Sequence, residues 1–391
     1  MMNDQSKQFL VFGAPLIEEE DIEEVAACLR SGWIGTGPRV AQFEADFASY
    51  KGTTASHAAA VNSCTAALHV SMVAAGLDAG AEVITTPLTF CATVNAIVHA
   101  GLTPVLADID PVSHCIDPAA IEAAITPRTQ AILPVHFAGR SCDMDAIMRI
   151  ANKHGLAVIE DCAHAIETTW KGRPAGTFGD FGCFSFYVTK NVVTGEGGMI
   201  LGRSEAHIAR AKMLALHGMS KDAWHRFGDK GYKHYQVVET GFKYNMMDLQ
   251  AALGLGQLRR VEANWRKREA VWQHYMQAFS GLPIGLPASV DALDSRHAFH
   301  LFTVQIDEEA VGLSRDQFLN AMNLRGIGTG VHYLSLAEHP VYQEKYGWQA
   351  EHWPNAMNVG RKTTSLPISA KMKVDDINRV IEIVSRIFSQ D

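Results

Sequence analysis

A lysine followed by a run of glycines is the segment with the clearest capacity for chemistry. Lys190 lies in Ser-Phe-Tyr-Val-Thr-Lys-Asn, which begins at Ser185, and Gly-Glu-Gly-Gly follows at 195–198. Apolar neighbours partly desolvate such a lysine, which lowers the pKa of its amine and makes the neutral amine available as a Schiff-base nucleophile. The glycines indicate a tight turn or a close approach of the backbone to a ligand. Taken alone, the pattern is more often explained by a surface lysine at the end of a strand.

A carboxylate ends an earlier apolar segment, Ala-Val-Ile-Glu-Asp at 157–161. If this segment is a strand of a parallel sheet, Asp161 lies at its carboxyl end, where α/β folds bind their ligands. A carboxylate there can hold a proton on a heterocyclic nitrogen, although a helix cap is the simpler alternative. His164 follows three residues later and is more often a packing residue than a catalytic one.

An anion site is indicated at residues 62–68, Asn-Ser-Cys-Thr-Ala-Ala-Leu. Small polar residues before an Ala-rich helix leave free backbone N–H groups around Cys64 and Thr65, at the positive end of the helix dipole. An ordinary helix cap by Ser63 or Thr65 is the alternative.

Together, the three segments match the requirements of pyridoxal 5′-phosphate (PLP). Its phosphate binds at a helix N-terminus, its ring nitrogen pairs with a carboxylate and its aldehyde reacts with a lysine. A carboxylate that keeps the ring nitrogen protonated lets the ring act as an electron sink. Phe90, after the segment at 82–86, is placed to stack on such a ring, although a core position explains it equally well.

The surrounding pattern predicts an α/β fold. Apolar segments rich in Val and Ile begin at 82, 104, 131 and 157, and helical spacing separates them at 118–124 and 144–154. Uniformly apolar strands between amphipathic helices are typical of a mostly parallel sheet covered on both faces. The segments 181–186 and 198–201 are expected to be strands joined by a polar turn, which leaves no room for a crossover helix and makes the sheet mixed.

A second, smaller α/β unit is predicted towards the C-terminus. Helical spacing runs from about 247 to 279, followed by a strand at 301–306, a helix at 315–325 and a terminal helix from about 374. We place the boundary within the long helix, with a large domain at 1–255 and a small domain at 256–391.

Composition excludes several classes of protein. The 391 residues are 47% hydrophobic, and 34 basic against 42 acidic residues give a net charge of −8, which argues against global disorder and against a general nucleic-acid binder. No apolar run approaches the roughly 20 residues of a membrane span. The seven cysteines form no Cys-x-x-Cys pair, so a zinc ribbon is not supported and no metal is expected. The cysteine pattern and the lack of a visible signal peptide predict a cytoplasmic protein.

The ordered motifs resemble the DegT/StrS family of PLP-dependent sugar aminotransferases, within the fold-type I aspartate aminotransferase superfamily. The resemblance covers nearly the whole chain, through residues 31–38, 63–67, 160–161, 185–186, 190, 195–198, 241–245 and 330–333. Within the family, the Glu-Asp-x-Ala-His pattern at 160–164 resembles that of enzymes that make 4-amino-4-deoxy-arabinose for lipopolysaccharide.

The resemblance implies a role for each candidate residue. Lys190 would hold the cofactor and move the proton between the substrate carbon and the cofactor, and Asp161 would pair with the ring nitrogen. Other cofactor contacts would come from Cys64, Thr65 and Ser185 to the phosphate, Phe90 to the ring face, His164 to the phenolic oxygen, and Asn245 to the phosphate of the partner subunit. Substrate contacts would come from Trp33, Ile34, Thr36 and His332.

The implied reaction is a ping-pong transamination in a homodimer with shared active sites. L-glutamate would donate the amino group, and a keto sugar linked to a nucleotide diphosphate would accept it, with C4 preferred over C3, in lipopolysaccharide or other amino-sugar biosynthesis. The basic loop at 219–240 either contacts the diphosphate or is simply solvated. The alternatives are a sugar dehydratase or lyase and a non-catalytic regulator with the same fold. Lys190 disfavours the 3-dehydratases of the family, which carry histidine there.

Overall fold

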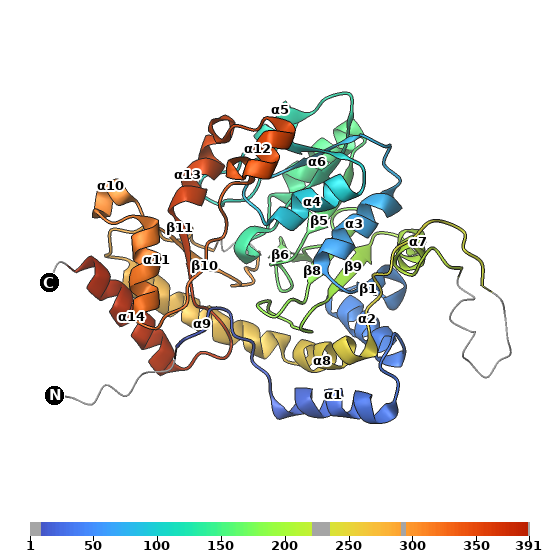
Figure 1. Cartoon of the computed structure of the whole chain (residues 1–391), viewed down its shortest axis with the longest axis horizontal. Coiled ribbons are helices and arrows are strands. Elements are labelled where there is room, and N and C mark those ends of the chain that lie inside the picture. Colours follow the sequence, from blue (N-terminus) through green and yellow to red (C-terminus); the bar gives the residue numbers. More distant parts are fainter. Residues whose placement is uncertain (1–8, 221–234, 291–294, 390–391) are drawn as a thin grey trace.

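The computed structural model describes residues 9–220, 235–290 and 295–389. Its centre is a seven-stranded sheet with the strand order β1-β9-β8-β5-β4-β2-β3 (Figure 1). Neighbouring strands are parallel except that β9 runs antiparallel to both β1 and β8. The strands are β1 (Ala58–Val61), β2 (Glu82–Thr85), β3 (Thr103–Leu106), β4 (Thr129–Leu133), β5 (Ala157–Asp161), β8 (Phe181–Ser185) and β9 (Gly198–Gly202). The predicted mixed, mostly parallel sheet is confirmed.

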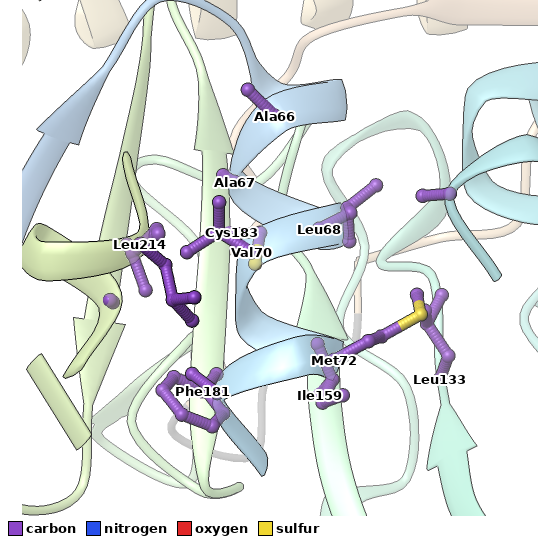
Figure 2. Packing of buried hydrophobic residues seen from close by; sticks show 14 of the residues in the cluster. Ala66, Ala67, Leu68, Val70, Met72, Leu133, Ile159, Phe181, Cys183 and Leu214 are labelled. Atoms are coloured by element: carbon purple, nitrogen blue, oxygen red, sulfur yellow. The ribbon is translucent and has the colours of Figure 1, made fainter. Parts of the chain in front are cut away.

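One face of the sheet is covered by α3 (Cys64–Ala75), which is apolar on nearly every side. Figure 2 shows Leu68 and Met72 of this helix near side chains of the central strands, including Ile159 and Phe181. A helix without a polar face is stable only when neighbours cover it all round. On this face α3 also contacts α4 (Cys91–His99) and α7 (Glu205–Ala215).

The opposite face packs against a different set of helices. Side chains of β8 alternate, so that Cys183 packs towards α3 while Phe184 lies against Phe47 of α2 (Pro38–Tyr50). The other helices of the large α/β unit are α1 (Glu19–Ser31), α5 (Pro118–Ala124), α6 (Met144–His154) and α8 (Asp248–Arg259), and a small hairpin is formed by β6 (Thr169–Trp170) and β7 (Arg173–Pro174). Both faces are therefore buried, as the apolar strands require.

The C-terminal unit packs around α9 (Val261–Phe279). The single helix expected over 247–279 is instead two helices, because α8 ends at Arg259 and Arg260 lies between them with non-helical backbone angles. Around α9 lie β10 (Phe302–Gln305), α11 (Arg315–Leu324) and α14 (Val374–Phe388), as predicted from the sequence, and β11 (Thr363–Leu366), which was not predicted. Shorter helices are α10 (Glu308–Val311), α12 (Pro340–Tyr346) and α13 (Pro354–Lys362). No helix among the described residues is long and apolar enough to cross a membrane.

The segment between β10 and β11 reaches back onto the large unit. Leu336 and Tyr342 pack with Val94 of α4 and Leu106 of β3. The Trp353 indole N–H donates to the Leu106 carbonyl at 3.0 Å. These contacts hold residues 330–335 beside the carboxyl ends of the central strands.

A buried carboxylate, Glu160, fixes the end of β5. Its Oε1 accepts from the backbone N–H groups of Phe178 and Gly179, and its Oε2 accepts from the N–H of Gly176 and from His136 Nε2 at 3.0 Å. Burial alone would raise the pKa of Glu160, but the hydrogen bonds from His136 and the backbone outweigh it and leave the pKa below its ordinary value. Glu160 is therefore a charged structural anchor directly before Asp161.

Replacing this anchor by alanine is expected to be strongly destabilising. In Glu160→Ala, three backbone N–H groups and His136 lose their buried acceptor, and the free energy of unfolding should fall by about 3–5 kcal/mol. Urea unfolding followed by circular dichroism measures the change. The matched control is Glu122→Ala, which removes an exposed partner of Lys153 and should have little effect. Equal effects of the two substitutions would contradict the structural role of Glu160.

Candidate active site

A cavity of about 500 Å³ opens at the carboxyl ends of the central strands, between the sheet and the segment around residue 332. Eight of the residues singled out in the sequence line it: Cys64, Thr65, Phe90, Asp161, His164, Ser185, Lys190 and His332. Their elements meet here because parallel strands end at the same edge of a sheet.

Lys190 lies in the turn that follows β8. Its backbone N–H donates to the Tyr187 carbonyl at 2.8 Å, and Tyr187 forms a bridge with Gly195, which closes the loop. Desolvation lowers the pKa of the Lys190 amine to about 8, although the nearby Cys64 and Asp161 act in the opposite direction. A substantial fraction of the amine is therefore neutral near physiological pH, as a Schiff-base nucleophile requires.

Asp161 is buried at the end of β5, within the electrostatic reach of Lys190. Its Oδ1 accepts from the Ala163 N–H at 3.1 Å, and its Oδ2 accepts from the Thr93 hydroxyl at 2.9 Å. Burial raises the pKa of Asp161 above its ordinary value despite these donors. Because a carboxylate offers about four acceptor positions, it retains capacity for a protonated ring nitrogen, which would restore the charge that burial disfavours.

The N-terminus of α3 lines the same cavity. The Ser63 hydroxyl caps the helix by accepting from the Ala66 N–H at 3.1 Å, whereas the N–H groups of Cys64 and Thr65 have no acceptor among the described residues. A Cβ on Gly198 would lie 2.5 Å from the Ser63 carbonyl oxygen, so a glycine is needed where β9 passes this helix start. Burial raises the pKa of Cys64 well above its ordinary value, so its thiol stays neutral and does not repel an anion.

Two further predicted residues, Phe90 and His332, line other parts of the cavity. Phe90 is 57% exposed although it is a large apolar side chain, and it lies at the mouth of the cavity. His332 is fixed by a 2.8 Å hydrogen bond between its Nδ1 and Ser365, and desolvation and the nearby Lys190 lower its pKa to about 3. His332 is therefore neutral.

Four predicted residues lie outside this cavity. Asn245 forms a bridge with Val61 at the end of β1, and its side-chain amide donates to the Thr36 hydroxyl. Trp33 and Ile34 are about half exposed nearby, and the Trp33 indole donates to the Thr36 carbonyl at 3.1 Å. In one chain these residues therefore form a separate surface group. Of the basic loop at 219–240, residues 221–234 lie outside the described residues.

Sequence reasoning missed several side chains that belong to the site. Thr93 holds the Asp161 carboxylate, Tyr333 contacts His164, and Tyr187 and Glu196 line the cavity. Thr93 lies on α4, within a turn of Phe90, so the segment was identified but not this residue. Tyr333 stands beside His332 in the motif at 330–333, and only the structure reveals its partner.

Comparison with known proteins agrees with this geometry. Residues 15–385 match the DegT/DnrJ/EryC1/StrS aminotransferase family. The spore coat polysaccharide biosynthesis protein SpsC of Bacillus subtilis is 48% identical over 387 residues, which cover 99% of each chain. The putative sugar aminotransferase Spr1654 of Streptococcus pneumoniae, solved in a PMP form, is 30% identical with a TM-score of 0.90 over 97% of this chain and 99% of that one. DesI, solved in the presence of its TDP-sugar product, is 31% identical with a TM-score of 0.86 over 98% and 94% of the two chains.

The chain belongs to the DegT/DnrJ/EryC1/StrS aminotransferase family. It is an aminotransferase of fold type I that depends on PLP, which confirms the predicted cofactor and fold class.

The residues of the cavity fit this cofactor. The free N–H groups at the start of α3 suit its phosphate, the buried Asp161 suits its ring nitrogen, and Lys190 suits its aldehyde. When bound, the cofactor supplies an electron sink for the pair of electrons left when a proton leaves the substrate carbon. The protein would supply the base, because the amine of Lys190 lines the same cavity and would take and return that proton.

The pKa of Lys190 predicts how cofactor loading depends on pH. Only the neutral amine can attack the aldehyde, so the rate at which apoprotein binds PLP covalently should rise as the pH increases through about 8 and level off above it. Stopped-flow absorbance measures this rate. In Lys190→Ala, PLP should bind only noncovalently and without this transition. A wild-type rate that is constant across the same range would contradict the role of Lys190.

Proposed function

We propose that the protein transfers the amino group of L-glutamate to a keto sugar linked to a nucleotide diphosphate, in the biosynthesis of a surface polysaccharide. The observation that carries the proposal is the convergence of Lys190, Asp161 and the start of α3 on one cavity. The similarity to SpsC supports a polysaccharide pathway, and the similarity to DesI supports a nucleotide-linked sugar.

We propose that the amino group is added at C4 of the sugar rather than at C3. Its support is the Glu-Asp-x-Ala-His pattern at 160–164, through its resemblance to enzymes that aminate a 4-keto arabinose for lipopolysaccharide. We place the reaction in the cytoplasm, in keeping with seven cysteines that are all unpaired.

Within the chain, we propose that residues 1–255 bind the cofactor and that residues 256–391 cover the sugar-binding side of the cavity. Residues of α9, β10, β11 and α14 share one hydrophobic cluster, which supports the division. His332, from the second part, lines the cavity.

The proposed enzyme is a homodimer in which each cavity is completed by the other subunit. In the single chain, Asn245, Thr36, Trp33 and Ile34 lie together outside the cavity that their predicted roles concern. Half-exposed Trp33 and Ile34 are large apolar groups of the kind that protein interfaces bury. A second copy could bring Asn245 to the phosphate and the other three to the sugar.

The first half-reaction provides a direct test. With L-glutamate alone, the holoenzyme should form one 2-oxoglutarate per cofactor, and a UDP- or TDP-linked 4-keto sugar should then be aminated, as measured by mass spectrometry. Lys190→Ala should lower the turnover by at least about 10²–10⁴-fold, the range of a lost acid–base group.

Two outcomes of this test would replace the proposal. Release of ammonia from an amino sugar, without 2-oxoglutarate formation, would favour a dehydratase or lyase. No turnover with any donor and keto sugar would favour a non-catalytic protein.

Subunit mixing tests the shared site. Lys190→Ala and Asn245→Ala chains, each weakly active alone, should regain activity when refolded together, because the mixed dimer contains one cavity with a native Lys190 from one chain and a native Asn245 from the other. The expected recovery is up to half of the wild-type activity per mixed dimer. If Asn245 serves the cavity of its own chain, mixing restores nothing above the two parents.

A further inference from the structure

A second, much smaller cavity lies beside the turn that carries Lys190. Its volume is about 20 Å³, against about 500 Å³ for the active-site cavity, and Thr189 and Lys190 line both. Its other walls include the N-terminal segment 13–16, residues of α8 and α9, and the segment 368–370. A water molecule needs a cavity of about 10–15 Å³, so this one has room for a single water molecule or monatomic ion.

Three buried polar side chains line this second cavity: Gln257 of α8, and Asn264 and Arg268 of α9, none more than 3% exposed. Asn264 and Arg268 are four residues apart and therefore lie on the same face of α9. Asn264 Oδ1 is buried without a hydrogen-bond partner among the described residues. A buried amide oxygen without a donor is costly, and cavities that stay empty are apolar. The second cavity is therefore suited to a polar ligand.

Gln257 provides a free acceptor. Its Nε2 group donates to the Leu16 carbonyl and to Asp21 Oδ2, both at 2.9 Å. Because both partners are acceptors, the orientation of the Gln257 amide is fixed and both of its hydrogens are used. Its Oε1 has no donor in the part of the chain that the structure describes.

Arg268 provides free donors. Its Nε–H donates to the Ala298 carbonyl at 3.4 Å and its Nη2 group donates to Glu167, whereas the two hydrogens on Nη1 have no acceptor among the residues described. The lining therefore offers both acceptors and donors. A chloride ion could use only the donors, and a sodium or potassium ion only the acceptors, with the charge of Arg268 close by. A water molecule matches both kinds of group.

We propose that the second cavity is a water site, and that its water joins Asn264 and Arg268 of α9 to the turn that carries Lys190. The N-terminal segment closes the site against this turn. Gly13 has a φ of +65°, and a Cβ there would lie 3.2 Å from Thr189 Cβ, so the segment packs directly on the residue before Lys190. Asn264 is then a positioning residue, which acts on Lys190 through the water and the turn.

A crystal structure of the holoenzyme, at a resolution that shows ordered water, tests the site directly. One density peak is expected within hydrogen-bonding distance of both Asn264 and Arg268. An empty cavity would overturn the proposal, and so would a peak with the anomalous signal of chloride or potassium.

Asn264→Leu tests the role of the asparagine in solution. Leucine has the same branching at Cγ but no polar atom, so it fills the space and offers the water no hydrogen bond. Oxygen-17 relaxation dispersion, which counts long-lived internal water molecules, should show one fewer per chain. The matched control is Asn152→Leu, at an exposed position of α6, which should lose none. Equal counts in the two variants would contradict the water site.

The positioning role is tested by the rate at which apoprotein binds PLP covalently. In Asn264→Leu the rate on the high-pH plateau should fall by between about tenfold and 10²-fold, as expected for a displaced reacting group. The midpoint near pH 8 should stay, because no charged group is changed. A protein that is merely less stable would load fewer chains, but at the wild-type rate. A wild-type plateau rate after loss of the water would refute the role of Asn264.

Neither readout depends on the proposed function. Water counting uses no substrate, and PLP loading uses only the cofactor, so a wrong amino donor or keto sugar would leave both results unchanged.

Discussion

The structure depends most on the different surroundings of two consecutive carboxylates, Glu160 and Asp161, at the end of β5. Successive side chains of a strand point to opposite faces, so Glu160 and Asp161 enter different environments although they are neighbours in sequence. Glu160 meets three backbone N–H groups and His136, and its charge is fully matched by protein donors. Asp161 meets only Ala163 N–H and Thr93, and burial raises its pKa. The first carboxylate anchors the strand, and the second keeps acceptor capacity for the cofactor.

Positive side chains are also scarce around the start of α3, where the phosphate of the cofactor is expected. The protein has a net charge of −8, and Lys190 is the only lysine or arginine among the described residues that line the cavity. The backbone N–H groups and hydroxyls at the start of α3 are the donors that this chain offers to a phosphate ester there. This arrangement leaves the amine of Lys190 available for chemistry, because no cluster of cations is needed close to it.

Much of this could be predicted from sequence because it depends on local pattern. The apolar strands β5 and β8, the helix start at Cys64 and the turn at Lys190 each have signals within a few residues. Thr93 and Tyr333 gave no such signal, because their roles arise from contacts with residues 68 and 169 positions away. Helical periodicity likewise did not reveal the break at Arg260, whose guanidinium pairs with the buried Asp21 in a tertiary contact. The role proposed for Asn245 depends on a second chain, which the structure of one chain does not contain.

The two parts of the chain meet at the residue next to the reactive lysine. The side-chain amide of Asn191 donates to Glu167 at 2.8 Å and to the Ala298 carbonyl at 3.0 Å, and Glu167 forms a buried ion pair with Arg268 of α9. With both amide hydrogens committed, the Asn191 oxygen must accept from His300 Nδ1, which fixes that tautomer as well. Because breaking a buried ion pair is costly, the lysine-bearing turn and α9 are held in one arrangement. The turn that carries Lys190 is thus fixed through Asn191 to Ala298 and, by way of Glu167, to Arg268, and His332 lines the same cavity.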